Sequence, residues 1–211
     1  MKYSKFYKTH GHSYEEYEKS HKERLDFLVK DLHLNSLEGK KIADVGCGLG
    51  FIYNRLNPKI QKNYKGYDGA AIKNPPFKYK KIDLDNFINV KEDYFFDLVL
   101  CFETVEHLTN PYNCLLGVKK ILKQNGIMFL TIPSPETQHN TIYPSLIYPA
   151  ENFITFLSQL AFEIIDHKSH NKSFCQELFI LKNKQWDQSQ MLWHKTENKF
   201  RNIPPHISIN L

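Results

Sequence analysis

The chain has 211 residues, of which 41% are hydrophobic and 24% are charged, values that predict one globular domain around a single core. No apolar run approaches the roughly 18–20 residues of a membrane span, and no signal peptide is evident, so we expect a cytoplasmic protein. The four cysteines are scattered and form no CxxC pair, so we expect neither disulfides nor zinc knuckles. The net charge of +5 is a lysine excess, since Arg24, Arg55 and Arg201 are the only arginines, and this scarcity of guanidinium groups disfavours a nucleic-acid partner without excluding it.

The first half of the chain alternates helical and strand patterns. Residues 14–33 form an amphipathic pattern that predicts a helix, with Leu25, Leu28 and Leu32 near one stripe. Residues 40–50 read as a short apolar strand that runs into a glycine-rich turn, and residues 51–56 read as helical. Three more strands are predicted after this helix, over residues 64–70, 79–87 and 95–103.

The second half continues the alternation and then changes. Residues 110–126 predict a helix that Asn125 and Gly126 close, and a fifth strand follows and ends at Pro133. A helix over residues 149–160 precedes two strand patterns with no helix between them, which favours an antiparallel pair. Strands that alternate with helices predict a parallel sheet covered on both faces.

The turn after the first strand carries three glycines in the pattern G-x-G-x-G, at Gly46, Gly48 and Gly50. Glycines at a strand-to-helix turn let a ligand lie against the main chain. The next two strands end in acids, with Asp68 placed to accept hydrogen bonds from ribose hydroxyls and Asp83 to accept them from an adenine amino group. Because a dinucleotide site prefers G-x-G-x-x-G, a ligand with ribose and adenine but no pyrophosphate fits better.

Five segments in this order resemble the class I S-adenosylmethionine-dependent methyltransferases. The segments are `IADVGCGLG`, `GYDGA`, `IDLD`, `FDLVLCFETVEHL` and `LKQNGIMFLTIP`, within a resemblance that covers roughly residues 38–182. The resemblance implies an α/β Rossmann-like three-layer sandwich, with a seven-stranded, mostly parallel sheet of order 3-2-1-4-5-7-6 and only strand 7 antiparallel. Within this class the chain resembles the ubiquinone-type O-methyltransferases most.

The resemblance also implies a cofactor, S-adenosylmethionine, and the residues that bind it. These residues are Asp44, Gly46, Cys47, Gly48, Gly50, Asp68, Gly69, Asp83, Leu84, Cys101 and Phe102. The domain organisation that follows is an N-terminal helical cap over residues 1–37, a methyltransferase domain over residues 38–184 and a C-terminal extension over residues 185–211.

A second polar cluster follows the fourth strand, where Glu103, Glu106 and His107 are spaced i, i+3 and i+4. If this segment is helical, the three side chains converge near one face and can hold Mg²⁺ or Mn²⁺. A resemblance to small-RNA 2′-O-methyltransferases adds His139 as a further metal ligand. Two other interpretations stay open: His107 as a metal-free general base, and acidic residues that only stabilise the start of a helix.

The function we expect is methylation of a hydroxyl group on a small acceptor, such as a metabolite or a sugar- or nucleotide-linked intermediate, with His107, Glu103 and Glu106 as catalytic residues. One alternative is an RNA 2′-O-methyltransferase with a metal-assisted site. Another is a noncatalytic partner protein that only binds the cofactor. The oligomeric state and the identity of the acceptor are open at this point.

Overall fold

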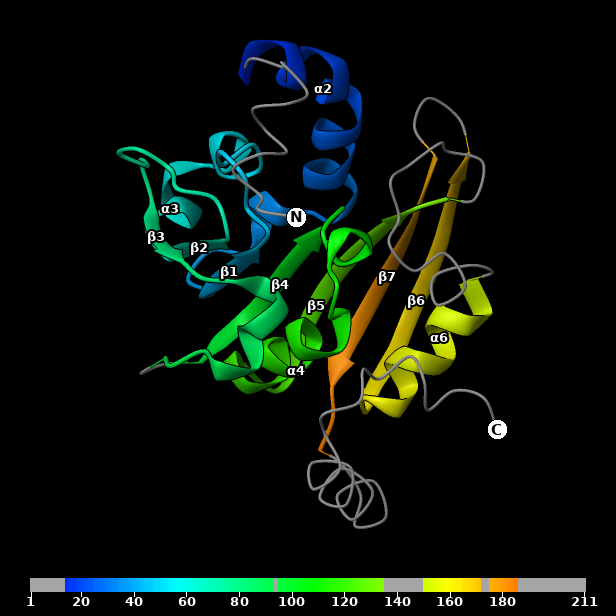
Figure 1. The fold of residues 1–211 in the computed structure, drawn as a ribbon. Coiled ribbons are helices and arrows are strands. Elements are labelled where there is room, and N and C mark those ends of the chain that lie inside the picture. Colours follow the sequence, from blue (N-terminus) through cyan, green and yellow to red (C-terminus); the bar gives the residue numbers. More distant parts are fainter. Residues whose placement is uncertain (1–13, 93–94, 135–149, 172–174, 186–211) are drawn as a thin grey trace.

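The computed structural model describes residues 14–92, 95–134, 150–171 and 175–185. Its centre is a seven-stranded sheet of order β3-β2-β1-β4-β5-β7-β6 (Figure 1), so the predicted strand order is confirmed. The strands are β1 Ile42–Val45, β2 Tyr64–Asp68, β3 Lys78–Lys81, β4 Phe96–Phe102, β5 Leu122–Pro133, β6 Phe162–Asn171 and β7 Cys175–Asn183. β7 is antiparallel to both neighbours, and the pairs among β1 to β5 are parallel.

Helices lie on both faces of this sheet (Figure 1). They are α2 Tyr14–Asp31, α3 Pro58–Gln61, α4 Pro111–Ile121 and α6 Ala150–Gln159, joined by 3-10 turns η1 Leu34–Ser36, η2 Tyr53–Arg55, η3 Leu84–Asn89 and η4 Val105–His107. None of the helices in the described part of the chain is long and apolar enough to cross a membrane.

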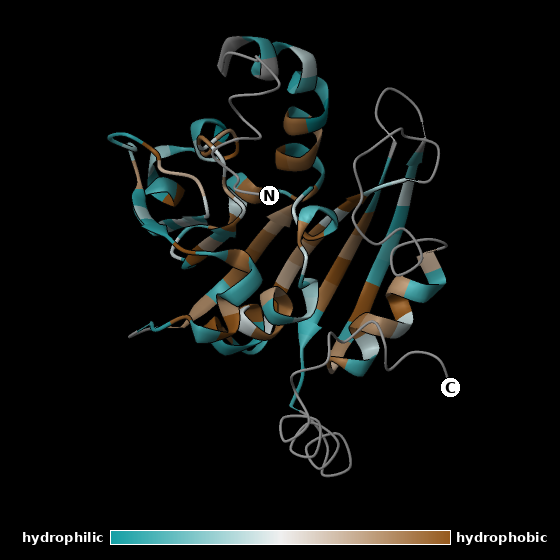
Figure 2. Cartoon of the chain, viewed as in Figure 1, coloured by the Kyte–Doolittle hydropathy of each residue, from teal (hydrophilic) through white to brown (hydrophobic). Residues whose placement is uncertain are grey.

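The core has two layers, because successive side chains of a strand point to opposite faces. In β4, Val99 and Cys101 pack into the layer under α4 and α6, whereas Leu98 and Leu100 pack into the layer under α2. The central strands are correspondingly hydrophobic along their length (Figure 2). This arrangement leaves the ends of the strands as the places where polar groups can gather.

Three predicted boundaries are wrong. The helix predicted over residues 110–126 ends at Ile121, and Asn125, with φ of 60°, lies in β5, where the register with β4 shifts between Leu122 and Ile127. The helical stretch predicted over residues 51–56 is only the turn η2. The third strand ends at Lys81, because Asp83 caps η3 instead of extending the strand.

Candidate cofactor and catalytic site

The three glycines of the turn after β1 have a left-handed backbone conformation, which would be strained in a residue with a side chain. Gly46, Gly48 and Gly50 have φ values of 84°, 51° and 85°. The Gly46 amide donates to the Tyr67 carbonyl oxygen at 2.8 Å, which ties the turn to β2. A Cβ atom at Gly46 would lie 2.0 Å from the Thr104 hydroxyl oxygen, and one at Gly50 would lie 2.4 Å from the Phe77 ring. The turn is therefore held close to the segment after β4.

Two buried acids frame this turn. Asp68, at the end of β2, accepts hydrogen bonds from the Gly48 amide at 2.9 Å and the Ala70 amide at 2.8 Å. Burial raises the pKa of Asp68, and these amides act in the opposite direction. Asp44, in β1, accepts a hydrogen bond from the Tyr64 hydroxyl at 2.5 Å, and burial raises its pKa to about 7. Both carboxyl groups are fixed in place at the carboxyl ends of neighbouring strands.

A cavity of about 80 Å³ lies between this turn, the end of β4 and helix α2. It brings together six of the predicted residues, namely Asp44, Gly46, Cys47, Gly48, Phe102 and Glu103. It also has lining residues that the motifs did not indicate, namely Arg24, Leu25 and Leu28 of α2, with Phe51 and Ile52 after the glycines. The position of the cavity, outside the carboxyl ends of parallel strands, is the usual ligand site of such sheets.

Arg24 joins α2 to the end of β4. Its guanidinium lies 3.3 Å from the Glu103 carboxylate, and both side chains are nearly buried. Burial raises the pKa of Glu103, whereas the Arg24 charge lowers it. The two residues are 79 positions apart in the sequence, so no local pattern pairs them. The sequence feature that could have indicated Arg24 is a rare arginine beside the apolar stripe of the first helix.

The segment after β4 differs from the helix we expected. Glu103 has φ of 46° at the end of the strand, and Glu106 and His107 lie in the short turn η4, so the three side chains are not on one helical face. Glu106 is fully buried, which raises its pKa well above the usual range, and Glu103 raises it further. The nearest His107 and Glu106 side-chain atoms are 3.6 Å apart.

Three of the four predicted metal ligands, Glu103, Glu106 and His107, lie in the part of the chain that the structure describes. Among the residues that the structure describes, no group of three His, Cys, Asp or Glu side chains is arranged to hold a metal ion. One oxygen of Glu103, Oε1, is buried and has no hydrogen-bond partner among the described residues. His139, the predicted fourth ligand, lies outside the described residues.

The remaining predicted cofactor residues, which include Gly50 and Asp68, do not line the cavity. The Asp83 carboxylate accepts hydrogen bonds from the Asp85 amide and the Asn86 side chain, and Leu84 beside it is buried. The Gly69 amide lowers the pKa of Asp68, and Cys101 is buried in β4 beneath the site. None of these residues, nor His107, belongs to the cavity wall.

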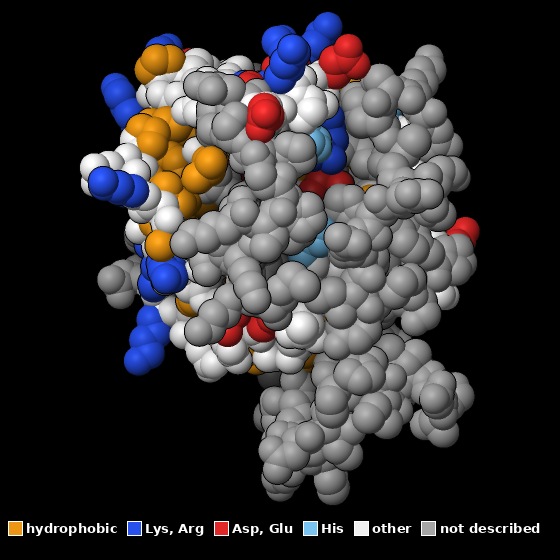
Figure 3. Space-filling model, turned by 45° about the horizontal axis from the view of Figure 1, so that its top comes forward, with side chains coloured by type: hydrophobic (Ala, Val, Ile, Leu, Met, Phe, Trp, Pro, Cys, Tyr) orange, Lys and Arg blue, Asp and Glu red, His pale blue; other side chains and the backbone are white. Residues whose placement is uncertain are grey.

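The surface above the site mixes charges of both signs. Figure 3 shows acidic, histidine and basic side chains close together near the centre of this face, while lysine and arginine side chains also lie along its rim beside an apolar patch. Among the side chains that are coloured in this view, the basic groups are spread out and form no continuous stripe.

Known proteins share both sequence and fold with this chain. Residues 14–173 match the family model described as a methyltransferase domain. The chain is 29% identical over 119 residues to a mitochondrial ubiquinone biosynthesis O-methyltransferase of Dictyostelium discoideum, covering 47% of this chain and 37% of that protein. It is 29% identical over 146 residues to a ubiquinone biosynthesis O-methyltransferase from Neisseria meningitidis serogroup A, covering 64% of this chain and 58% of the relative. The chain thus spans roughly half of the length of these relatives.

Solved structures agree in fold. An S-adenosylmethionine-dependent methyltransferase from Clostridium acetobutylicum has a TM-score of 0.56 at 15% identity, over 76% of this chain and 91% of that one. The N-methyltransferase NodS from Bradyrhizobium japonicum, in complex with S-adenosylhomocysteine, has a TM-score of 0.56 at 15% identity, over 79% and 88%. The predicted class I methyltransferase fold is confirmed, and the family match over most of the chain shows that this protein belongs to the methyltransferase-domain family.

Proposed function

We propose that the protein transfers a methyl group from S-adenosylmethionine to a hydroxyl group of a small acceptor. The observation that carries this proposal is the cavity at the carboxyl ends of β1 and β4, walled by the glycine-rich turn, Asp44 and Glu103 and closed by α2. The relatives named as ubiquinone biosynthesis O-methyltransferases support a hydroxyl as the methylated group.

Several residues fit the cofactor. Asp68 is held by the Gly48 and Ala70 amides, and each of its oxygens retains a lone pair for a ribose hydroxyl. The Arg24 guanidinium, in the cavity wall, suits the carboxylate of the methionine part, because its planar fork binds carboxylates in a bidentate way. Asp83 and Leu84 are the proposed neighbours of the adenine.

The cavity must enlarge for this ligand to bind. Its volume of about 80 Å³ is well below the roughly 300–1,000 Å³ of a site for a drug-sized ligand. The α2 side is joined to the end of β4 by the Arg24–Glu103 ion pair, whereas the opposite side is part of the hydrogen-bonded sheet. We propose that cofactor binding displaces α2 and exchanges the Glu103 partner of Arg24 for the cofactor's carboxylate.

The bound cofactor would supply an electrophilic methyl group on a sulfonium. The chain's own contribution is to hold an acceptor hydroxyl in line with that methyl and to remove its proton. His107 is the proposed base, and the nearest oxygen of the buried Glu106 carboxyl group lies 3.6 Å from the His107 ring nitrogen. The predicted Mg²⁺ or Mn²⁺ does not fit the described side chains as they stand, so no step of the proposal uses it.

Substitution of His107 tests the catalytic part of the proposal. His107→Gln should lower kcat by about 10²–10⁴-fold, measured as transfer of a radiolabelled methyl group to a panel of phenols, because a positioned base contributes that much. His21→Gln is the matched control and should leave kcat unchanged, because the His21 ring makes an exposed hydrogen bond with the neighbouring Ser20 hydroxyl in α2 and does not follow β4. Full activity of His107→Gln would contradict the assignment.

Two further readouts separate the alternatives. Adding Mg²⁺ or Mn²⁺ to chelator-treated protein should leave kcat unchanged; a metal-dependent rate that Glu103→Ala removes would restore the metal-assisted mechanism. Binding of S-adenosylhomocysteine without transfer to any phenol would favour the noncatalytic interpretation, and salt-dependent binding and methylation of RNA would favour the nucleic-acid one.

A further inference from the structure

Gln176 in β7 is a buried polar side chain that none of the roles above uses. It is fully buried, and among the residues that the structure describes neither the oxygen nor the nitrogen of its amide has a hydrogen-bond partner. A buried amide without partners costs folding free energy, because water satisfies both groups in the unfolded chain. Unsatisfied groups of this kind are uncommon in folded proteins, and a ligand that is absent is one physical reason for them.

The position of Gln176 places it at the ligand-binding edge of the sheet. β7 runs antiparallel to β5, so its first residues lie beside the last residues of β5, and Gln176 pairs with Pro133. On its other side it pairs with His170 of β6. Ligands of sheets with this topology bind outside the carboxyl ends of the parallel strands, which is the end where Gln176 lies.

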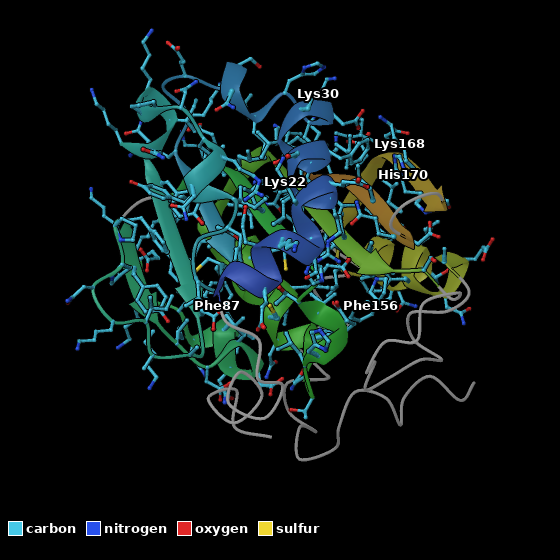
Figure 4. All side chains as sticks on the ribbon, turned by 90° about the horizontal axis from the view of Figure 1, so that it is seen from above. Lys22, Lys30, Phe87, Phe156, Lys168 and His170 are labelled. Carbon is cyan, nitrogen blue, oxygen red and sulfur yellow. The ribbon has the colours of Figure 1, made fainter. Side chains whose placement is uncertain are left out.

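Gln176 also faces the same side of the sheet as the cavity. Alternate residues of β7 share a face, and Leu178 and Ile180 pack in the core layer under α2 together with Phe102. His170, its partner in β6, contacts Phe27 of α2 with ring centroids 4.2 Å apart, and Figure 4 shows His170 alongside that helix. Gln176 is thus on the face that α2 covers.

The separation from the cofactor residues suits a bound acceptor. One strand, β5, lies between β4 and β7, so Gln176 is two strand spacings, about 10 Å, from the end of β4. The cofactor residues lie on the other side of β4, at β1 and β2. An acceptor whose hydroxyl is near Phe102 and Glu103 would contact Gln176 if it extended that distance along the face that α2 covers.

We propose that Gln176 selects the methyl acceptor through a neutral group that presents a hydrogen-bond donor and an acceptor side by side, as a carboxamide does. This inference rests on the function proposed above. The Gln176 carbonyl would accept from the donor and its amino group would donate to the adjacent oxygen, so both buried atoms gain a partner. A carboxylate offers no donor, and it would leave the Gln176 oxygen unpaired and facing a negative charge.

The first test needs no ligand. Gln176→Leu replaces the unpaired amide with an apolar side chain of similar size and should raise the thermal unfolding midpoint of the free protein by roughly 2–4 °C. Gln159→Leu, at an exposed position of α6, is the matched control and should shift the midpoint by less than about 2 °C. A lower midpoint for Gln176→Leu would mean that the amide is paired in solution and would overturn the inference.

The second test measures selectivity with 3-(4-hydroxyphenyl)propanamide and 3-(4-hydroxyphenyl)propanoate, which share the phenol and differ only in the group at the far end of the molecule. The wild type should have the higher kcat/KM for the propanamide, and Gln176→Leu should lower that value about 10- to 100-fold through KM, leaving S-adenosylhomocysteine affinity unchanged. Equal values for the two probes in the wild type, or an unchanged preference in Gln176→Leu, would overturn the inference. A wild type that does not bind S-adenosylhomocysteine would instead overturn the proposed function.

Discussion

Gly46 combines two constraints that exclude any side chain. Its φ of 84° is in the left-handed region, and the space where a Cβ atom would lie is occupied by Thr104, from the segment after β4. The first constraint is local and is the reason why a glycine-rich turn can be found in the sequence. The second depends on the contact of two segments that are far apart in the chain, and only the fold reveals it.

Alanine at Gly46 should be markedly destabilising. The left-handed backbone alone costs a residue with a side chain about 1–2 kcal/mol, and displacing Thr104 adds about 1–3 kcal/mol. Gly39 provides the matched control, because its φ is 79° and nothing lies within 4 Å of the point where a Cβ atom would stand. Urea unfolding should show that Gly46→Ala loses at least about 1 kcal/mol more than Gly39→Ala. Equal losses would mean that the turn moves away from Thr104 at little cost.

Residue patterns indicated part of the site and missed the rest for a physical reason. Asp44 and the glycines are close together in sequence, so a local motif contains them, and Asp44, Gly46 and Gly48 line one cavity. The spacing of Glu103, Glu106 and His107 suggested one helical face, but the strand ends with a left-handed Glu103 and the segment becomes a short turn. Spacing predicts convergence only after the backbone conformation is known.

At the scale of elements, α2 is the part of the structure that closes the site. It contributes Arg24, Leu25 and Leu28 to the cavity, and Arg24 forms an ion pair with Glu103 at the end of β4. Because both side chains are nearly buried, each depends on the other for charge compensation. The amphipathic pattern predicted the helix, whereas its place on the sheet depends on contacts with residues far along the chain.

A double-mutant cycle measures this coupling. Arg24→Met leaves the Glu103 carboxylate buried without its partner and should lower the free energy of unfolding at pH 8 by about 3 kcal/mol. The double variant with Glu103→Gln should recover most of that loss, because no charge is then left uncompensated. Lys22→Met removes an exposed pair with Asp26 on the same helix and should cost less than about 0.5 kcal/mol. Additive losses in the double variant would show that α2 is not joined to β4 by this pair.

The ends of elements show where sequence reasoning is weakest. Asn125 and Gly126 are typical of a helix end, yet α4 ends at Ile121 and these residues belong to β5. Leu122 packs in the core and pairs with Phe96, so burial and strand pairing determine the boundary. Local propensity is a weak preference that tertiary packing overrides.

At the scale of the whole molecule, the order of the strands is the feature that creates the site. β1 and β4 are neighbours although two strands separate them in sequence, so the glycine-rich turn and Glu103 meet at one edge. Alternation of strands and helices predicted a parallel sheet, but the specific order followed from the resemblance of five ordered motifs to one family. No local pattern contains that order, because it is set by which strands pair.

Isothermal titration of the wild-type protein with S-adenosylhomocysteine tests the central claim most directly. The proposed site predicts saturable binding of one molecule of S-adenosylhomocysteine per chain and weaker binding by the Arg24→Met variant. It also predicts no binding of NAD, because the G-x-G-x-G turn lacks the spacing that binds a pyrophosphate. Binding should also raise the unfolding midpoint in proportion to the logarithm of ligand concentration at saturation. The absence of any binding heat or midpoint shift with S-adenosylhomocysteine would contradict the proposed cofactor site.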